Sequence, residues 1–286
     1  MISRRAAAEA FIAACRDELE APKPGNVHAY APGHGMTVAQ FVASSAAAAD
    51  WLCMPAARVG ARIRGAVEAS LKAAGANTNL GIVLLCAPLA AAAELENLQL
   101  HAGLVRVLDG LDIGDADDAF AAIARAAPAG LGRAERHDVF APAQVTLKQA
   151  MAQAADRDRI ARQYATAFAD VFGLGMTLHA AAMTRWCDPK WATLAVYLGF
   201  LSAFPDSHVV RKQGAEAAAD ICRTAMTFNA ALWSAQHPAD RLGDLLTWDA
   251  ALKTRGINPG TSADLTVATL FGCRLQCALP SAHNSG

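Results

Sequence analysis

The chain has 286 residues, of which 54% are hydrophobic and only 6% aromatic. A chain of this length buries roughly three quarters of the surface it would expose when unfolded, so its stability requires neither a disulfide nor a structural metal. Its 25 basic and 26 acidic residues give a formal net charge of −1, which excludes the basic excess typical of general nucleic-acid-binding proteins.

The spacing of apolar residues predicts helices along the whole chain, because apolar positions recur every three to four residues. Alanine, the strongest helix former, supplies much of the hydrophobic fraction, and no run of alternating β-branched residues predicts a strand. The predicted helices span 6–20, 38–53, 58–74, 80–95, 97–109, 116–126, 147–169, 170–187, 190–203, 208–235, 241–254 and 262–279. We therefore expect an all-α fold, a single-domain multi-helix bundle over residues 1–286.

Several predicted helices begin with capping motifs. Thr37 and Gln40 form a capping box, in which each side chain bonds the other residue's backbone N–H, and Thr146 with Gln149 repeats it. Thr261 and Asp264 have a weaker form of the pattern. These motifs fix the expected starts of three helices.

The cysteines and the apolar runs of the sequence indicate where in the cell the protein is expected to lie. The seven cysteines include no CxxC pair, and most lie in apolar stretches, which favours buried free thiols in a reducing compartment. The longest apolar runs, around 80–93 and 191–204, are interrupted by Pro88 or shorter than the ~18 residues of a membrane span. We therefore expect a cytoplasmic protein without membrane association, and its alanine-rich helical surface is compatible with a homodimer.

Five polar joints that contain glycine or proline separate the predicted helices. In helical proteins, binding groups are often placed on such loops by a rigid scaffold. The joints span 21–28, 75–81, 130–139, 205–212 and 256–264. The sequence therefore predicts a ligand site at interhelical loops.

Several of these joints also have a purely structural interpretation. Lys23 is suited to a phosphate, or it is a solvated lysine in an ordinary turn. Asn77, Thr78 and Gly81 open a helix whose free N–H groups suit an anion, or they provide an ordinary N-cap. Asp206 begins a segment with His208, Arg211 and Lys212 that suits phosphate and Mg²⁺, or it caps a helix beside a solvated turn. The charges at 157–159 and Arg162 also have the spacing of surface ion pairs.

Taken in order, the joints resemble the triphosphoribosyl-dephospho-CoA synthase family over about residues 18 to 270. The matching segments are Pro22-Lys23-Pro24-Gly25, Asn77-Thr78-x-x-Gly81, Asp206-Ser207-x-Val209 with Arg211, and Gly260 through Leu265. This resemblance implies an all-helical enzyme that transfers a triphosphoribosyl group from ATP to the 2′-hydroxyl of 3′-dephospho-CoA and releases adenine.

The chain departs from the citrate-lyase type of the family. That type usually has His-Lys where this chain has Asn79-Leu80, and a His-Arg pair where it has Arg211-Lys212. The segments 26–28, 134–139 and 156–162 look more like shorter relatives in archaea and methylotrophic bacteria, which accompany C1 metabolism on tetrahydromethanopterin. Pentosyl transfer to a precursor of that carrier is therefore an alternative activity, and a non-catalytic helical ligand-binding protein is an alternative of another class.

Displacement at a ribose anomeric carbon passes through an oxocarbenium-like state that carboxylates stabilise, and the acceptor hydroxyl needs a base. We expect Asp206 or Asp264 to face the sugar or to bind Mg²⁺, the expected cofactor, and His137 with Asp138 to form an acid/base pair. The residues expected to bind substrate or phosphate are Lys23, Gly25, Asn26, His28, Asn77, Thr78, Gly81, Arg162, Ser207, His208, Arg211, Lys212, Gly260 and Thr261. The expected ligands are a nucleotide or phosphoribosyl donor and a cofactor-precursor acceptor.

Overall fold

The structure is a computed structural model that describes residues 2–128, 130–133 and 136–279. The elements in chain order are α1 (Arg4–Glu20), α2 (Val38–Leu52), α3 (Val59–Ala74), α4 (Leu80–Ala93), α5 (Leu100–Asp109), α6 (Ile113–Ala126), α7 (Leu147–Ala154), α8 (Arg159–Ala165), the π-helical η1 (Asp170–Gly175), α9 (Met176–Trp186), α10 (Pro189–Ala203), α11 (Ser207–Gln213), α12 (Ala215–Ser234), the 3₁₀-helical η2 (Pro238–Arg241), α13 (Leu242–Thr254) and α14 (Gly260–Ala278). The all-α prediction is confirmed: the described residues form helices and no strand.

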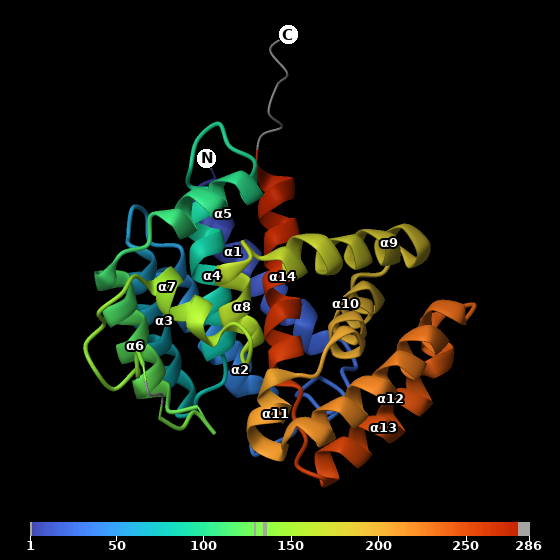
Figure 1. Cartoon of the computed structure of the whole chain (residues 1–286). Helices are drawn as coiled ribbons and strands as arrows, with labels where there is room; N and C mark the ends of the chain where they lie inside the picture. The colour runs from blue at the N-terminus through green and yellow to red at the C-terminus, as the bar shows by residue number, and fades with distance from the viewer. Residues whose placement is uncertain (1, 129, 134–135, 280–286) are drawn as a thin grey trace.

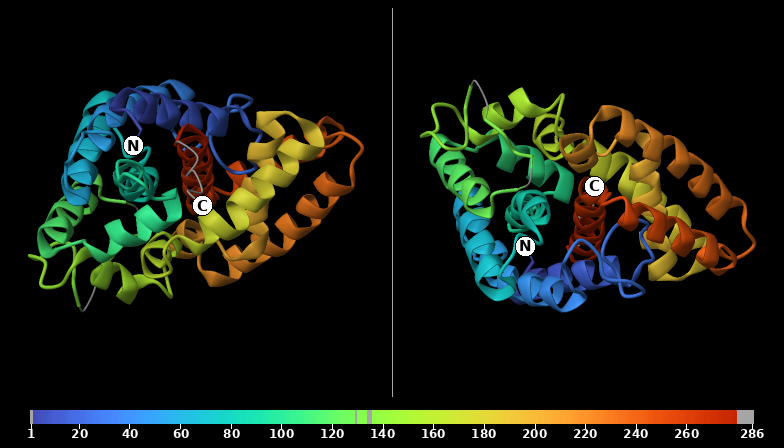
Figure 2. Two further views of the ribbon diagram at one scale, coloured as in Figure 1. Left: turned by 90° about the horizontal axis from the view of Figure 1, so that it is seen from above. Right: turned by 90° about the horizontal axis from the view of Figure 1, so that it is seen from below.

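Helix α14 lies at the centre of the arrangement (Figures 1 and 2). It packs against α1, α4 and α10 along its length, and against α8 and α11 near the cavity described below. Helices α2 to α8 lie on one side of it and α9, α10, α12 and α13 on the other (Figure 1), and α1 packs against α2 on one side and α10 on the other. Two buried apolar clusters follow this division, and α10 and α14 contribute side chains to both.

Capping side chains determine where many of the helices begin. The two capping boxes predicted at Thr37–Gln40 and Thr146–Gln149 are present. The box predicted at Thr261–Asp264 is wrong, because α14 begins at Gly260 and Pro259 precedes it. The Asp264 side chain therefore does not cap this helix.

Two predicted helices are each divided into two. The stretch 147–169 breaks between α7 and α8, because the Asp158 side chain accepts hydrogen bonds from Ile160 and Ala161 and starts a new helix. The stretch 208–235 breaks at Gly214, whose φ of 92° and ψ of 165° end α11 and begin α12. Both breaks lie beside the polar joints and bring short helices α8 and α11 towards the start of α14 (Figure 1).

No helix among the described residues is long and apolar enough to cross a membrane.

Candidate functional site

A cavity of about 940 Å³ opens where four helices begin and where α6 and α7 form an opposite wall. The starts of α4, α8, α11 and α14 contribute lining residues, as do α6, α7, the loop at 26–36 and the segments 127–128, 130–133 and 136–139. Its volume lies at the upper end of the roughly 300–1,000 Å³ range of small-molecule sites. The cavity therefore has room for a large ligand or for two.

The start of α4 supplies the segment Asn77 to Gly81. Each of its polar side chains has a fixed partner: Asn77 Oδ1 accepts from the Leu80 N–H at 3.2 Å, Thr78 Oγ1 lies 2.6 Å from Ser44 Oγ, and Asn79 Nδ2 donates to Ser70 Oγ at 3.0 Å. The first turn of a helix leaves backbone N–H groups without intrahelical acceptors, and its dipole is positive there. This helix start therefore offers donors to an anion.

Asp264 lies in the first turns of α14 and lines the cavity without a partner among the described residues. No hydrogen bond or ion pair joins its carboxylate to any of them. Burial, followed by the charges of Asp206 and Glu18, raises the pKa of Asp264 well above its usual value. Gly81 lies opposite, and a Cβ at that position would overlap the Asp264 carboxylate. The glycine thus makes the space that the carboxylate occupies.

Asp206 has the opposite environment, and its expected role as a sugar-facing or metal-binding carboxylate is corrected. It is 1% exposed and does not line the cavity. Its Oδ1 accepts from the N–H groups of His208 and Val209, and its Oδ2 accepts from Ser262 N–H at 2.7 Å and Ser262 Oγ at 2.8 Å. With all four positions occupied, Asp206 fastens the start of α11 to the start of α14.

His208 and Arg211 extend from the short helix that Asp206 begins. Burial, followed by the nearby charges of Arg211 and Lys212, lowers the pKa of His208 to about 4, so its imidazole is neutral at pH 7. Its Nε2 is buried without a hydrogen-bond partner among the described residues. A Cβ at Gly260 would lie 2.6 Å from His208 Nδ1, so glycine is required there. His208 and Gly260 both line the cavity, and the imidazole contributes no positive charge to it.

Basic side chains line the same cavity. Arg211 Nη1 lies 2.6 Å from Asp158 Oδ2, an ion pair that ties α11 to α8. Lys212 is exposed and forms no ion pair or side-chain hydrogen bond with the described residues. The remaining basic residues of the lining are Arg133, Arg136 and Arg157. This concentration of positive charge suits a polyanion, although the chain as a whole is nearly neutral.

His137 and Asp138 line the cavity from the loop after α6. His137 has a φ of 51°, in the left-handed region. Asp138 Oδ1 accepts from Phe140 N–H at 2.8 Å and pairs with Arg133 at 3.4 Å. Their role as an acid/base pair stays a prediction.

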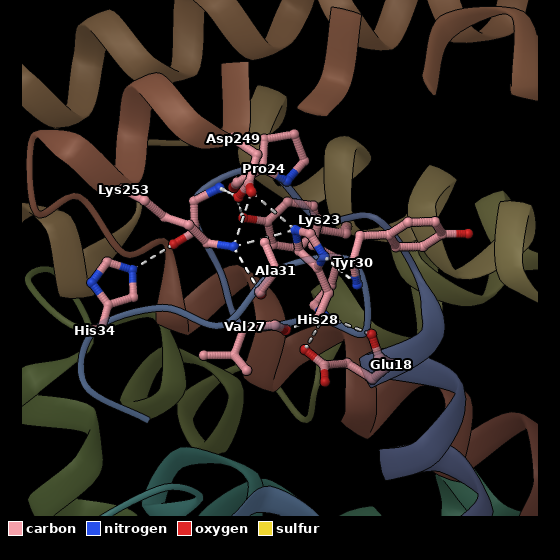
Figure 3. Close-up of polar contacts among 12 residues, drawn as sticks. Glu18, Lys23, Pro24, Val27, His28, Tyr30, Ala31, His34, Asp249 and Lys253 are labelled. Atoms are coloured by element: carbon pink, nitrogen blue, oxygen red, sulfur yellow. Dashed lines mark hydrogen bonds and ion pairs between the residues drawn. The ribbon is translucent and has the colours of Figure 1, made fainter. Parts of the chain in front are cut away.

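The Lys-Pro-Gly loop contributes only part of what was expected (Figure 3). Lys23 is fully buried and lies outside the cavity lining; its Nζ donates to the Glu18 and Val27 carbonyls and pairs with Glu18 Oε1 at 3.1 Å. Those contacts use all three N–H groups, so the expectation of a phosphate-binding lysine is corrected. Gly25 and His28 also lie outside the lining, whereas Asn26 belongs to it.

Three other predicted residues lie outside the cavity lining. Ser207 Oγ accepts from Arg159 N–H at 2.9 Å, and Thr261 Oγ1 accepts from His208 N–H at 3.2 Å, so both hold helix starts together. Arg162 is exposed on α8. The structure thus places these three residues around the site rather than in its wall.

Sequence reasoning also missed residues that line the cavity. They include Glu18, His34, Asn79, Asp158 and Asn258, together with the apolar wall of α6 and α7. Asp158 carried a usable signal, because an aspartate before a short helical run is a preferred N-cap. Glu18 carried none, since it lies within a helix whose buried face the sequence does not distinguish at that position.

The carboxylates of the described residues around the cavity do not form a complete metal site by themselves. Among the described residues, no group of three or more His, Cys, Asp or Glu side chains is arranged to hold a metal ion. Mg²⁺ in nucleotide sites is commonly bound by one or two carboxylates together with substrate phosphates. Asp264 fits such a ligand, whereas Asp206 does not.

Comparisons with known proteins agree with this architecture. The family model described as ATP:dephospho-CoA triphosphoribosyl transferase matches residues 4–282. The crystal structure of a proposed triphosphoribosyl-dephospho-CoA synthase from Archaeoglobus fulgidus superposes with a TM-score of 0.63 at 24% identity, covering 83% of this chain and 98% of that one, and this likeness supports the fold. No curated protein matches the chain. Because the family model spans nearly its whole length, the chain belongs to the ATP:dephospho-CoA triphosphoribosyl transferase family.

Proposed function

We propose that this transferase moves the triphosphoribosyl group of ATP to the 2′-hydroxyl of 3′-dephospho-CoA within the cavity at the helix starts. The observation that carries the proposal is that a carboxylate without a partner among the described residues, Asp264, lies in one cavity with helix starts and basic side chains. The carboxylate can act on the reacting sugar, and the helix starts and basic side chains can hold a triphosphate. Family membership favours an enzyme over a non-catalytic binding protein.

The reaction forms a bond from the acceptor oxygen to C1′ of the ribose and breaks the bond from C1′ to N9 of adenine. The electron pair of the broken bond leaves with adenine, which takes up a proton. In the proposal, the ionised Asp264 carboxylate faces the sugar as positive charge develops on it, and it takes the proton of the acceptor hydroxyl as the new C1′–O bond forms. Burial raises the pKa of Asp264 above that of a free aspartate, which makes its carboxylate a stronger base once it is ionised. His137 is the candidate proton donor to adenine.

The two walls of the cavity suggest how two substrates share it. The starts of α4, α11 and α14 with Arg211 and Lys212 suit the triphosphate of ATP. The opposite wall is apolar and includes Phe120, Ile123 and Met151. It suits the long uncharged arm of the acceptor, which ends in a thiol. In this arrangement, the acceptor hydroxyl reaches the sugar near Asp264.

A magnesium ion bound with ATP would neutralise part of the charge of the triphosphate. Asp264 and the phosphates of ATP would hold it, because Glu18, which also lines the cavity, and Asp206, which lies behind the lining, already have partners. The two roles of Asp264 make different predictions. In Asp264→Asn, loss of a base lowers kcat at saturating Mg²⁺, whereas loss of a metal ligand mainly raises the Mg²⁺ concentration needed for half-maximal rate.

The direct test incubates the protein with Mg²⁺-ATP and 3′-dephospho-CoA and measures the released adenine by chromatography. We expect adenine only when the acceptor is present, and a kcat at least about 100-fold lower in Asp264→Asn, the size of a general acid–base contribution. Asp188→Asn, which changes the aspartate that caps α10 away from the cavity, is the control. Adenine without acceptor, or full activity in Asp264→Asn, would contradict the proposal. If ATP binds but no adenine forms, the alternative acceptor from C1-carrier biosynthesis becomes the next candidate.

A further inference from the structure

A buried group of charged side chains lies behind the Lys-Pro-Gly loop, outside the cavity lining (Figure 3). It joins the loop to α13, which is far from it in the sequence. His28 is 0% exposed, Asp249 is 3% exposed and the Lys253 side chain is 13% exposed. None of these three residues lines the cavity. Buried charges of this kind are costly unless their partners are well placed, so their arrangement fixes the loop strongly.

Asp249 is the centre of the group. Its Oδ1 accepts from the Gly25 N–H at 2.8 Å, and its Oδ2 lies 2.9 Å from Lys253 Nζ and 3.2 Å from His28 Nε2. His28 Nδ1 accepts from the Tyr30 N–H at 3.2 Å, so the proton of the neutral ring lies on Nε2 and points to Asp249. One carboxylate therefore holds two points of the loop.

The rest of the loop is held from the same side. Lys253 Nζ also donates to the Ala31 carbonyl at 3.1 Å. Tyr197 Oη donates to the Pro24 carbonyl at 2.7 Å. Gly25 has a φ of 81°, and a Cβ there would lie 2.9 Å from Pro259 Cδ, so the loop passes close against the 257–259 segment. The backbone from Pro24 to Ala31 thus has little freedom.

The opposite side of this loop faces the site through Asn26 and His34. Asn26 Nδ2 donates to Asn258 Oδ1 at 2.8 Å, and all three of these residues line the cavity. His34 Nε2 lies 2.7 Å from the carbonyl oxygen of Gly25. The N–H of the same glycine donates to Asp249 Oδ1. Gly25 therefore connects Asp249 to both Asn26, its neighbour in the chain, and His34.

We propose that Asp249 is a positioning residue, which sets Asn26 and His34 against a substrate in the cavity through its bond to Gly25. The identity of that substrate rests on the proposed function. Asp249 touches no substrate, and Asn26 and His34 contact a part of it that does not change during the reaction. Loss of Asp249 therefore weakens binding of the ground state and the transition state equally, which raises KM and leaves kcat unchanged.

The test compares Asp249→Ala and Asp249→Asn with Asp244→Asn, an exposed control on the same helix. We expect KM for ATP or for dephospho-CoA to rise about tenfold in Asp249→Ala, the effect of one lost hydrogen-bonded contact, with kcat within about twofold of wild type. Asp249→Asn keeps an oxygen for the Gly25 N–H and should recover most of the KM. If Asp249→Ala does not fold, Lys253→Met, which removes the bond to the Ala31 carbonyl, is compared instead.

A double-mutant cycle separates positioning from general stability. In the Asn26→Ala/His34→Ala background, the effect of Asp249→Ala on KM should disappear, because the side chains that it positions are gone. The proposal would be overturned if Asp249→Ala lowered the Tm but left KM unchanged. It would also be overturned if Asp249→Ala raised KM by the same factor in the Asn26→Ala/His34→Ala protein as in wild type. If the protein releases no adenine, the same variants are compared by titration calorimetry with ATP and with dephospho-CoA, so failure of the proposed function is recognised separately.

Discussion

The surroundings of two aspartates near the start of α14 assign them different tasks. The four hydrogen bonds to Asp206 hold it between α11 and α14. Asp264 has no partner among the described residues and lies in space left by Gly81. Both carboxyls have a raised pKa, and burial is the main cause for each. Their hydrogen bonds, rather than their titration, therefore distinguish the residue that supports the site from the residue that is available to a ligand.

For Asp206→Asn, we expect lower stability with retained turnover. An asparagine directs an NH₂ group at the Ser262 N–H and hydroxyl, leaving a buried donor unsatisfied at a cost of about 1–3 kcal/mol. Thermal unfolding should show a Tm lower by several degrees, and activity should persist below that temperature. Asp188→Asn is the control, because asparagine caps a helix as well as aspartate. An unchanged Tm with lost turnover would return Asp206 to the chemistry.

For Gly81→Ala, we expect a loss of activity without loss of the fold. The added methyl would overlap the Asp264 carboxylate and lie 2.7 Å from Ile160 Cδ1, so the carboxylate must leave its place. The rate of adenine release should fall at least about tenfold, since small misplacements of a reacting group are costly. Gly243→Ala is the control, because no atom lies within 4 Å of its added Cβ. Normal activity in Gly81→Ala would show that Asp264 need not stay where it is.

Sequence patterns located the residues near the cavity better than they assigned their roles. Asn77, Thr78 and His208 line it as predicted, but Lys23 and His28 support the loop from behind. A lysine beside two prolines suggests an exposed turn, and only the fold shows that Glu18 lies 3.1 Å away and neutralises it. Roles that depend on long-range partners, such as Asp249 for His28, have no local signal.

At the scale of elements, short helices and the breaks beside them shape the site. Helices α8 and α11 have seven residues each, begin at an aspartate cap and are tied by the Arg211–Asp158 ion pair. The helix predictions succeeded where periodicity and capping boxes agreed, as in α2, but merged α7 with α8 and α11 with α12. Apolar periodicity continues through such breaks, so the signals that mattered were Asp158 and Gly214.

For Gly214→Ala, we expect lower stability. The φ of 92° and ψ of 165° at this residue belong to a region that essentially only glycine adopts, so the substitution costs about 1–3 kcal/mol. Denaturant unfolding should show a lower midpoint with an unchanged slope. Gly173→Ala, at a site with open space and no positive φ, serves as the control. A stable Gly214→Ala protein would mean that α11 and α12 can join without this turn.

At the scale of the whole molecule, the central position of α14 connects the site to both apolar clusters. Ala263 belongs to one cluster, whereas Leu265 and Phe271 belong to the other. Asp264 lies between residues of the two. The position of its carboxylate is therefore set by packing from both sides of the molecule, which the sequence pattern alone did not reveal.

Stability should depend on pH through His208. Its pKa is about 4 in the folded protein, below the 6.5 of an unperturbed imidazole, so the unfolded chain binds more protons between these values and folding weakens as pH falls from 6.5 to about 4. His208→Asn lacks this contribution. The stability difference between wild type and variant, measured by denaturant unfolding, should be constant above about pH 7 and shift against the wild type below about pH 6. A difference that stays constant down to about pH 4.5 would contradict a buried neutral imidazole.

The two walls of the cavity also differ in how readily their residues can be substituted without disturbing the core. The wall formed by the starts of α4 and α14 belongs to helices packed on several sides, so a substitution there disturbs the core as well as the ligand. The wall formed by α6 and α7 belongs to helices farther from the centre of the molecule (Figure 1). With the substrates arranged as proposed, changes of acceptor during evolution or by directed selection should accumulate on α6 and α7, while the wall proposed for the donor stays fixed.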